Sequence, residues 1–470
     1  MTLLATSLVL WAASTLAASP PPPPSPPTPS PGLCQPLASL SFAHAPTTLP
    51  GLKAQLIYNN VSEPRGIRFD NRQNLLVVER YIGVSSLTFR NDSGCIGWEK
   101  RAVVRNETLE HGIEIGPGEG PFQYLYASSM EYVFRWKYNP ATTSVVGAPV
   151  TIAWNMSNVG AIPPDHVTRT LLLEPPVNGK STHLIVSRGS AGNVDDAAAD
   201  PNNGSAQIRR FPLDKPIPAK GYAWQSGQLL SWGNRNGVGI ALSKDNKNLW
   251  EIENGSDEVF WRGVDVHEDN PAEELNLIPI EGNEKIPIQR KFYGYPSCFT
   301  AWNSSAVPPN PTGPQFNFDT GAQFSIRNPP TTPTDAWCAD PKNNVPPKLS
   351  LQSHTAPLDL VFYQGPKVYS KLGINTKWAG DAFASLHGSW NRDPPSGYAV
   401  IRIPFKKDGS GPVAPSNSKT GYEKLVWMPD TTRCPDECIR PVGVAFDQAS
   451  RMFVTSDDSN EILIVESAGA

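Results

Sequence analysis

The sequence predicts an all-β protein folded as a six-bladed β-propeller, and three observations carry this prediction. Short runs of Val, Ile, Leu, Tyr and Phe alternate with turns of Gly, Pro, Asn and Asp, which is typical of all-β proteins. Prolines number 49 among 470 residues, about twice the usual share, and no segment has a convincing amphipathic helical pattern. A unit of two strands also recurs six times along the chain.

The first residues are apolar and are expected to be a secretory signal, residues 1–19. The short apolar stretch ends in small residues, as signal peptides do, although the usual basic segment at the start is missing because no Lys or Arg precedes Lys53. A Pro/Ser-rich leader follows over residues 20–33. It favours polyproline II and is either a stiff tether or a plain disordered stretch. Residues 34–470 are expected to form one secreted, extracellular domain without a membrane-spanning segment.

Cysteines and sequons agree with this secreted class. Six cysteines in such a chain predict disulfides, with zinc as the alternative, although no Cys-x-x-Cys pair supports zinc. Six cysteines allow 15 connectivities; nearness in the sequence favours Cys298–Cys338 and Cys434–Cys438, which leaves Cys34–Cys95 as the third pair. Sequons for N-glycosylation stand at Asn60, Asn91, Asn106, Asn155, Asn203, Asn254 and Asn303. Asn254 is a doubtful glycan site because its motif is expected to lie in a pocket.

The repeated unit is an alternating strand, a turn and a second strand, followed by an outer hairpin. Its copies cover residues 64–79, 110–129, 168–187, 235–253, 356–387 and 440–456. Four-stranded repeats close into a propeller because each blade buries its faces against its neighbours. We expect the C-terminal strand, residues 461–465, to pair with strands near residues 38–44 and so close the ring.

Polar residues begin the first strands of several units, and these strand starts meet at one mouth of a propeller channel. They are Arg65, His111, Arg235, Asn236 and Arg440, and His387 joins them from the tip of a second strand. The net charge of −4 and the absence of a basic run exclude nucleic acid and anionic membranes as expected partners. Clustered guanidiniums repel one another and bind carboxylates in pairs. The sequence therefore predicts a pocket for a small polyanion with several carboxylates.

Several motifs carry a family resemblance that spans about residues 50–465. They read PRGIRFD, EHGIEI, NRNGVGIAL, ENGSDE, DVHEDNPAEELN, FYGYPSCFTAW and LHGSWNRDPPSGYAVIRIPF. The chain resembles the PQQ-dependent sugar dehydrogenases of the sorbosone and soluble glucose dehydrogenase type, above all the fungal pyranose dehydrogenases of the auxiliary-activity class. The resemblance implies a six-bladed propeller that binds Ca²⁺ and pyrroloquinoline quinone (PQQ), a planar tricarboxylate.

The resemblance also implies roles for individual residues. His111 would be the general base that takes the proton of the anomeric hydroxyl while hydride passes from C1 to the quinone, and a structural His is the alternative. Arg235 and Asn236 would hold the quinone oxygens. Arg65, His387 and Arg440 would hold the carboxylates and the ring. His387 stands where bacterial glucose enzymes have Lys, which points to the fungal branch. Trp390 would stack on cofactor or substrate, or would be a core residue.

Calcium would bind at the loop that contains Gly255, Ser256 and Asp257. The resemblance implies backbone carbonyl ligands at the first two positions, and side-chain ligation by Ser256 or Asp257 stays open. Nearby, Glu273 and Glu274 are expected to be a solvated pair, with a second calcium site as the alternative. Among the other histidines, His354 is the best candidate for a pocket position.

The implied function is oxidation of aldoses or ketoaldoses, of the L-fucose or 2-keto-D-glucose type, by a secreted monomer active in lignocellulose degradation. Because the chain ends without a cytochrome domain, the electron acceptor is expected to be separate, a b-type cytochrome or a copper polysaccharide monooxygenase. Two alternatives come from other classes. A calcium-dependent propeller lactonase would surround its metal with Glu, Asp and Asn, whereas mainly Arg and His converge here. A non-catalytic glycan- or protein-binding propeller would not depend on His111.

Overall fold

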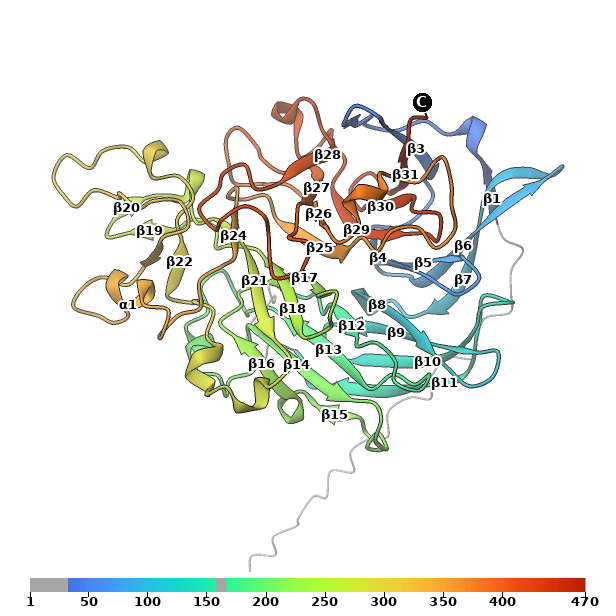
Figure 1. Ribbon diagram of the computed structural model, residues 1–470, viewed down its shortest axis with the longest axis horizontal. Coiled ribbons are helices and arrows are strands. Elements are labelled where there is room, and N and C mark those ends of the chain that lie inside the picture. Colours follow the sequence, from blue (N-terminus) through green and yellow to red (C-terminus); the bar gives the residue numbers. More distant parts are fainter. Residues whose placement is uncertain (1–32, 158–165, 470) are drawn as a thin grey trace, which may run out of the picture.

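The computed structural model describes residues 33–157 and 166–469, and it is a ring of six β-sheets (Figure 1). The predicted signal peptide and all but the last residue of the predicted leader lie outside the described residues. Within the described ranges, the only α-helix is α1 (Asp335–Ala339), and none of their helices is long and apolar enough to cross a membrane. The prediction of an all-β six-bladed propeller is confirmed.

Each blade has four antiparallel main strands, which follow one another outward from the channel in chain order except in blade 6, where the outermost strand comes from the N-terminal part of the chain. Blade 1 contains β4 (Pro64–Phe69), β5 (Leu75–Glu79), β6 (Gly83–Asp92) and β7 (Cys95–Arg105). Blade 2 contains β8 (Leu109–Pro117), β9 (Gln123–Ser129), β10 (Val133–Asn139) and β11 (Ser144–Trp154). Blade 3 contains β12 (Leu171–Leu173), β13 (His183–Arg188), β14 (Gln207–Pro212) and β16 (Gln228–Trp232).

The second half of the ring repeats this order. Blade 4 contains β17 (Gly237–Leu242), β18 (Asn248–Glu253), β21 (Glu273–Pro279) and β24 (Leu349–Leu351). Blade 5 contains β25 (Pro357–Phe362), β26 (Ala382–Leu386), β27 (Ala399–Ile403) and β28 (Glu423–Trp427). Blade 6 contains β29 (Pro441–Phe446), β30 (Met452–Ser456), β31 (Glu461–Ser467) and β3 (Leu52–Tyr58). Short edge strands extend three blades, namely β1 (Leu33–Pro36), β2 (Thr47–Thr48) and β15 (Tyr222–Ala223).

The ring closes where the two ends of the folded chain share blade 6. As predicted, the last strand pairs with an N-terminal segment, but that segment is β3 and not residues 38–44. Residues 38–39 belong to a short 3₁₀ helix, and none of the residues 38–44 forms a strand; the backbone amide of Ala43 only donates to the Glu461 carboxylate at 2.8 Å. β3 is long enough to follow β31 over seven residues and buries its last three against the core.

The innermost strands share a bulge at the end where they begin. The register of the first two strands shifts at this end in five blades, those that start with β4, β8, β17, β25 and β29. Glycines allow neighbouring innermost strands to touch there: a Cβ on Gly66 would lie 2.4 Å from the His111 carbonyl oxygen, and one on Gly112 would lie 2.1 Å from that of Arg169. The Arg-Gly and His-Gly pairs of the sequence therefore mark the crowded end of the channel.

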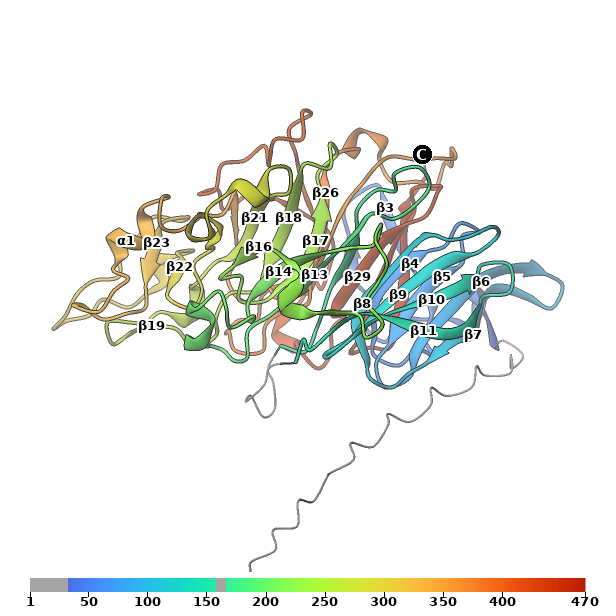
Figure 2. The same cartoon turned by 90° about the horizontal axis from the view of Figure 1, so that it is seen from below.

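An insertion leaves blade 4 between β18 and β24 and projects from the ring (Figures 1 and 2). It contains α1 and four short strands, β19 (Phe260–Trp261), β20 (Val264–Asp265), β22 (Cys298–Thr300) and β23 (Gln323–Ser325). Its small core gathers around Phe299, Phe316 and Phe324. The Cys298–Cys338 disulfide fastens α1 to β22, and the other two predicted pairs, Cys34–Cys95 and Cys434–Cys438, are also present.

Removing the Cys298–Cys338 bridge by alanine substitution of both residues is expected to lower the free energy of unfolding by about 4 kcal/mol, because a crosslink restricts the unfolded chain more when it closes a longer loop. The sequence separation is 40 for this pair and 4 for Cys434–Cys438. The same change at Cys434–Cys438 is therefore expected to cost only about 2 kcal/mol. Urea unfolding followed by tryptophan fluorescence measures both losses, and equal losses would contradict the loop-length argument.

Candidate active site

A polar pocket with a volume of ≈ 130 Å³ opens at the end of the channel where the innermost strands begin. Segments from blades 3, 4 and 5 form its wall; most lie just before a first strand or just after a second strand, and one lies at the start of the third strand of blade 4. Six of the residues predicted for the site lie on this wall: Arg235, Asn236, Gly255, Ser256, Asp257 and Trp390. The wall also includes His166, Asn254, Glu273, His354 and Asn391.

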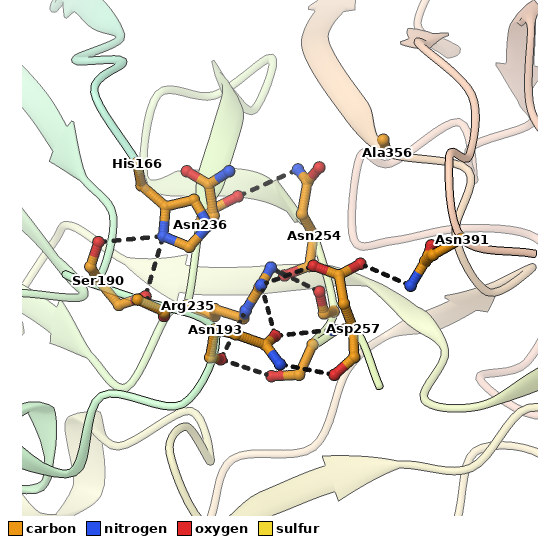
Figure 3. A network of polar contacts seen from close by, with 12 residues as sticks. His166, Ser190, Asn193, Arg235, Asn236, Asn254, Asp257, Ala356 and Asn391 are labelled. Carbon is orange, nitrogen blue, oxygen red and sulfur yellow. Dashed lines mark hydrogen bonds and ion pairs between the residues drawn. The ribbon is translucent and has the colours of Figure 1, made fainter. Parts of the chain in front are cut away.

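Arg235 is the centre of this pocket and is almost completely buried (Figure 3). Its Nη1 donates to the Gly255 carbonyl oxygen at 2.6 Å, and its Nη2 donates to Asn193 Oδ1 at 2.8 Å and to Asp257 Oδ2 at 3.1 Å. Its Nε donates to the Asn193 carbonyl oxygen at 3.1 Å. The guanidinium therefore joins the predicted calcium loop to blade 3.

The calcium loop itself is held by hydrogen bonds from several blades. The Asn254 amide donates to the Pro357 carbonyl oxygen at 2.7 Å, and the Gly255 backbone amide donates to Glu273 Oε2 at 2.5 Å. Asn254 is buried, which agrees with the doubt about its sequon. The Ser256 hydroxyl donates to the Asn193 carbonyl oxygen at 3.1 Å, so it is turned toward blade 3.

The donor set of this loop suits calcium, which prefers oxygen ligands. The carbonyl oxygen of Gly255 and the carboxylate of Asp257 both face the Arg235 guanidinium, so they already converge on one cationic group. No cluster of three or more His, Cys, Asp or Glu side chains that could hold a metal ion occurs in the part of the chain that the structure describes. The residues present fit a calcium site that combines backbone carbonyls with one carboxylate.

The other four predicted residues form a second cluster beside the pocket: Arg65, His111, His387 and Arg440. This cluster also contains Asp457, which the sequence did not predict. Asp457 accepts hydrogen bonds from Arg65 Nη1 at 2.5 Å and His387 Nε2 at 2.8 Å. Arg440 donates to the carbonyl oxygens of His387 at 3.3 Å and Gly388 at 3.1 Å. Gly388, which lines the pocket, has a φ of 100°, so the chain turns sharply after β26 and leaves His387 at the channel mouth. This turn connects the two clusters.

Charges in the second cluster compensate one another. Burial alone would raise the pKa of Asp457, but His387 and Arg65 hold it well below the usual range, so Asp457 is an anion. The guanidiniums of Arg65 and Arg235 are thus each paired with an aspartate, whereas the sequence had predicted unpaired arginines waiting for an external anion. The buried Nε of Arg65 still has no partner among the described residues, which leaves one donor for a ligand.

His111 is buried at the bulge of β8 and is 2% exposed. Burial first, then Arg65 and Arg68, lower its pKa well below the usual value, so the imidazole is neutral. Its Nδ1 is also without a partner among the described residues. A neutral imidazole with an unpaired ring nitrogen is suited to accepting a proton. His111 lies among the residues that belong to the second cluster and is not on the pocket wall.

The prediction for Glu273 and Glu274 as a solvated pair was wrong. Glu273 is 2% exposed and Glu274 9% exposed, because β21 lies between β18 and β24 and the insertion covers its start. Glu273 accepts from the backbone amides of Gly255 and, at 3.0 Å, Ala356. It therefore braces the calcium loop against blade 5. The expectation that His354 lies in the pocket is confirmed. Burial alone would lower the pKa of His354, but hydrogen bonds to Asp257 and to the His267 carbonyl oxygen outweigh burial and raise the pKa above its usual value.

Sequence reasoning missed the partners that orient the predicted residues. Asn193 follows β13, and Asp457 follows β30, so both sit where a second strand reaches the channel mouth, as His387 does after β26. This shared position after a second strand is a sequence signal from which Asn193 and Asp457 could have been predicted. The sequence also suggested no role for His166, which precedes β12 and lies beside Arg235 and Asn236.

The buried donors fit a planar polycarboxylate. The orphaned Nε of Arg65 and the guanidiniums of Arg235 and Arg440 surround the channel mouth. PQQ has such a shape and charge, and the oxygen atoms that would hold calcium lie next to Arg235. The roles assigned to the ten predicted site residues remain predictions.

Known proteins resemble this chain over most of its length. A family model described as TrAA12-like matches residues 46–468. The chain is 34% identical over 431 residues to a Hypocrea jecorina (strain QM6a) protein named pyrroloquinoline quinone-dependent sugar dehydrogenase, covering 90% of this chain and 89% of that one. It is 33% identical over 454 residues to the pyrroloquinoline quinone-dependent pyranose dehydrogenase of Coprinopsis cinerea, covering 93% of this chain but 56% of that one.

A solved structure agrees with these relatives. The holo form of the pyranose dehydrogenase PQQ domain from Coprinopsis cinerea superposes with a TM-score of 0.76 at 32% identity, covering 90% of this chain and 97% of that one. The family resemblance predicted from the sequence is confirmed, and the predicted enzyme class is the one stated in the names of these relatives. The match of the family model to nearly all of the folded chain shows that the protein belongs to the TrAA12-like family.

Proposed function

We propose that the protein is a PQQ- and Ca²⁺-dependent dehydrogenase that oxidises the anomeric carbon of pyranoses or ketoaldoses such as L-fucose and 2-keto-D-glucose. One observation carries this proposal: Arg235 and Asn236 share a pocket with the oxygen-rich loop of Gly255 and Asp257. A quinone and a metal ion can thus lie side by side. The names of the relatives, PQQ-dependent sugar and pyranose dehydrogenases, support the same reaction.

The residues of the two clusters divide the binding of such a cofactor between them. Arg235 and Asn236 hold the quinone oxygens, and Arg65, His387 and Arg440 hold the carboxylates and the ring. Gly255, Ser256 and Asp257 hold calcium. Trp390 lies at the pocket rim and is 66% exposed, so its ring face is available to stack on cofactor or sugar. Bound PQQ with calcium supplies an electrophilic quinone that accepts a hydride.

His111 supplies the protein's own chemical step. Its neutral imidazole takes the proton of the anomeric hydroxyl, which leaves electron density on the sugar oxygen and weakens the C1–H bond. Asp457 orients this chemistry indirectly, because it fixes Arg65, whose charge acts on His111, and also holds His387. The product is a lactone or the acid that it forms in water.

The electrons leave through a separate one-electron acceptor outside the cell, a b-type cytochrome or a copper polysaccharide monooxygenase. In this proposal the protein is secreted and acts as a monomer. The three disulfides and the predicted signal sequence support an oxidising, extracellular location.

Titration of the purified cofactor-free protein with PQQ tests the proposal. We expect tight binding that requires Ca²⁺ and is lost when EDTA removes the ion, because the loop that would hold calcium shares its pocket with Arg235 and Asn236, which would hold the quinone. Reduction of a one-electron dye should then depend on L-fucose or 2-keto-D-glucose. Binding of PQQ without turnover would support PQQ as the cofactor and would show that L-fucose and 2-keto-D-glucose are not substrates. No binding, together with calcium-dependent lactone hydrolysis, would replace the dehydrogenase by a propeller lactonase.

A further inference from the structure

The Cys434–Cys438 disulfide lies in the link between blades 5 and 6, immediately before the innermost strand of blade 6. This link runs from the end of β28 at Trp427 to the start of β29 at Pro441. The two cysteines are 4 positions apart, so their bond closes a tight loop. Arg440, one of the residues that the proposed function assigns to the cofactor carboxylates, follows Cys438 by two positions. The proposed roles give this crosslink no part in binding.

Few other contacts hold the crosslinked loop in place. Among the described residues, the hydrogen bonds of residues 430–439 stay within that range, as from the Glu437 amide to the Arg433 carbonyl oxygen at 3.1 Å. The ion pair between the same two side chains is exposed and adds little to stability. Burial of both cysteines and of Ile439 is what connects the loop to the ring.

The buried side of the disulfide packs into a core that also contains Tyr398. Cys438 is fully buried and Cys434 is 8% exposed, and both belong to the same hydrophobic cluster as Tyr398. The Arg440 guanidinium lies over the Tyr398 ring, with Cζ 5.9 Å from the ring centroid. A Cβ on Gly388 would lie 2.4 Å from Cζ of Tyr398. The crosslink, Arg440 and the turn that lines the pocket thus share one aromatic support.

Arg440 connects the crosslinked loop with the turn after β26. Its Nε donates to the His387 carbonyl oxygen at 3.3 Å and its Nη2 to the Gly388 carbonyl oxygen at 3.1 Å. Its backbone amide donates to Ser456 Oγ at 2.9 Å. The two side-chain bonds go to carbonyl oxygens, so they direct the guanidinium without neutralising its charge. Among the described residues no hydrogen bond uses Nη1, and this nitrogen can donate to an anion.

We propose that the Cys434–Cys438 disulfide is a positioning element of the cofactor site, which holds Arg440 in the orientation that binds a carboxylate of the cofactor. Because the bond spans only 4 positions, it restricts the unfolded chain weakly, and stabilising the fold is its smaller effect. A guanidinium that is held in place before binding loses less conformational entropy when the anion arrives. Without the bond, residues 430–439 keep only local hydrogen bonds, and the chain that leads into Arg440 gains freedom. This inference rests on the proposed function.

The test compares full chains that each lack one disulfide. In Cys434→Ala/Cys438→Ala, the affinity for PQQ in the presence of Ca²⁺ is expected to fall about 10-fold in a fluorescence titration. Cys34→Ala/Cys95→Ala is the matched control, because this bond joins β1 to β7 at the outer edge of blade 1 and spans 61 positions. Its removal destabilises the fold more but should leave PQQ affinity within about 2-fold. If the first pair does not fold, Cys434→Ala/Cys438→Val replaces it and refills the buried position.

A double-mutant cycle decides whether the disulfide acts through Arg440. Arg440→Ala alone should lower PQQ affinity about 10- to 100-fold, since it removes a hydrogen bond from a charged group. Removing the Cys434–Cys438 bond from that variant should then cost almost no further affinity, because no guanidinium remains to be positioned. An unchanged affinity in the folded variant without the bond would overturn the inference. Fully additive losses would overturn it as well, since the bond would then act elsewhere.

Hydrogen exchange of the cofactor-free proteins separates this inference from the proposed function. Loss of the Cys434–Cys438 bond should speed exchange about 10-fold in the peptides that contain Arg440 and Gly388, whereas the control pair should not change them. Equal exchange in wild type and variant would overturn the inference even if PQQ binds. A wild type that does not bind PQQ, together with faster exchange in the variant, would instead overturn the proposed function, and the crosslink would still be the element that orders Arg440.

Discussion

Replacing His111 by alanine is expected to lower kcat about 10²- to 10⁴-fold, which is the contribution that a positioned general base makes. Binding of PQQ should change little, because His111 is not on the wall of the pocket that contains Arg235 and the calcium loop. Its neutral imidazole and unpaired Nδ1 are the features that suit it to accept a proton. Stopped-flow measurement of cofactor reduction under single-turnover conditions separates the chemical step from reoxidation by the dye.

His111→Gln keeps most of the volume of the buried ring and removes the base, so it tests chemistry with less disturbance of packing. Circular dichroism and thermal unfolding verify that both variants are folded. If either folded variant reduces its cofactor at the rate of the wild type, His111 is not the base. A loss of PQQ binding that parallels the loss of turnover would assign His111 to cofactor binding instead.

Replacing Asp457 by asparagine is expected to lower the free energy of unfolding by about 3–5 kcal/mol, the cost of breaking a buried ion pair on one side. The change leaves the guanidinium of Arg65 buried without its carboxylate, and it weakens the bond to His387. Affinity for PQQ should fall as well, because both side chains lose their fixed positions. Urea unfolding at pH 7 and fluorescence titration with PQQ measure the two effects.

Asp447 is the matched control, since it is a buried aspartate of the same blade that pairs with Arg451. Arg451 is 32% exposed at its side chain, so water solvates it when Asp447→Asn removes the partner, and the loss should be only about 1 kcal/mol. Equal losses in the free energy of unfolding for the two variants would mean that burial of the Arg65–Asp457 pair does not increase its contribution to stability.

The dependence on pH has a defined sign. In the folded protein the pKa of Asp457 lies below its value in the unfolded chain, about 3.9. A group of this kind stabilises the fold at a pH above the unfolded pKa and loses that contribution as the pH falls toward the folded pKa. The difference in stability between wild type and Asp457→Asn should therefore be constant from pH 7 to about pH 5 and should shrink below about pH 4. A difference that grows on acidification would contradict the assignment.

Local patterns in the sequence determined the architecture. Each propeller unit is a strand, a turn and a strand that adjoin in the chain, so alternation and turn residues are sufficient to find all six. The Arg-Gly and His-Gly pairs were also readable, because each marks the bulge that begins an innermost strand. Nearness in the sequence was enough for the disulfides, since two of them join residues separated by 4 and 40 positions and the third uses the cysteines that remain.

Only the tertiary structure decided how these residues are partnered. Arg65 and Asp457 are 392 positions apart, and no local pattern connects the first blade with the last. The burial of Glu273 and Glu274 depends on an insertion folding over β21, and ring closure by β3 depends on which N-terminal segment reaches β31. The sequence alone thus determined the blades and the residue types at the channel mouth. Their ion pairs, their burial and the place of His166 depend on contacts that exist only when the ring has closed.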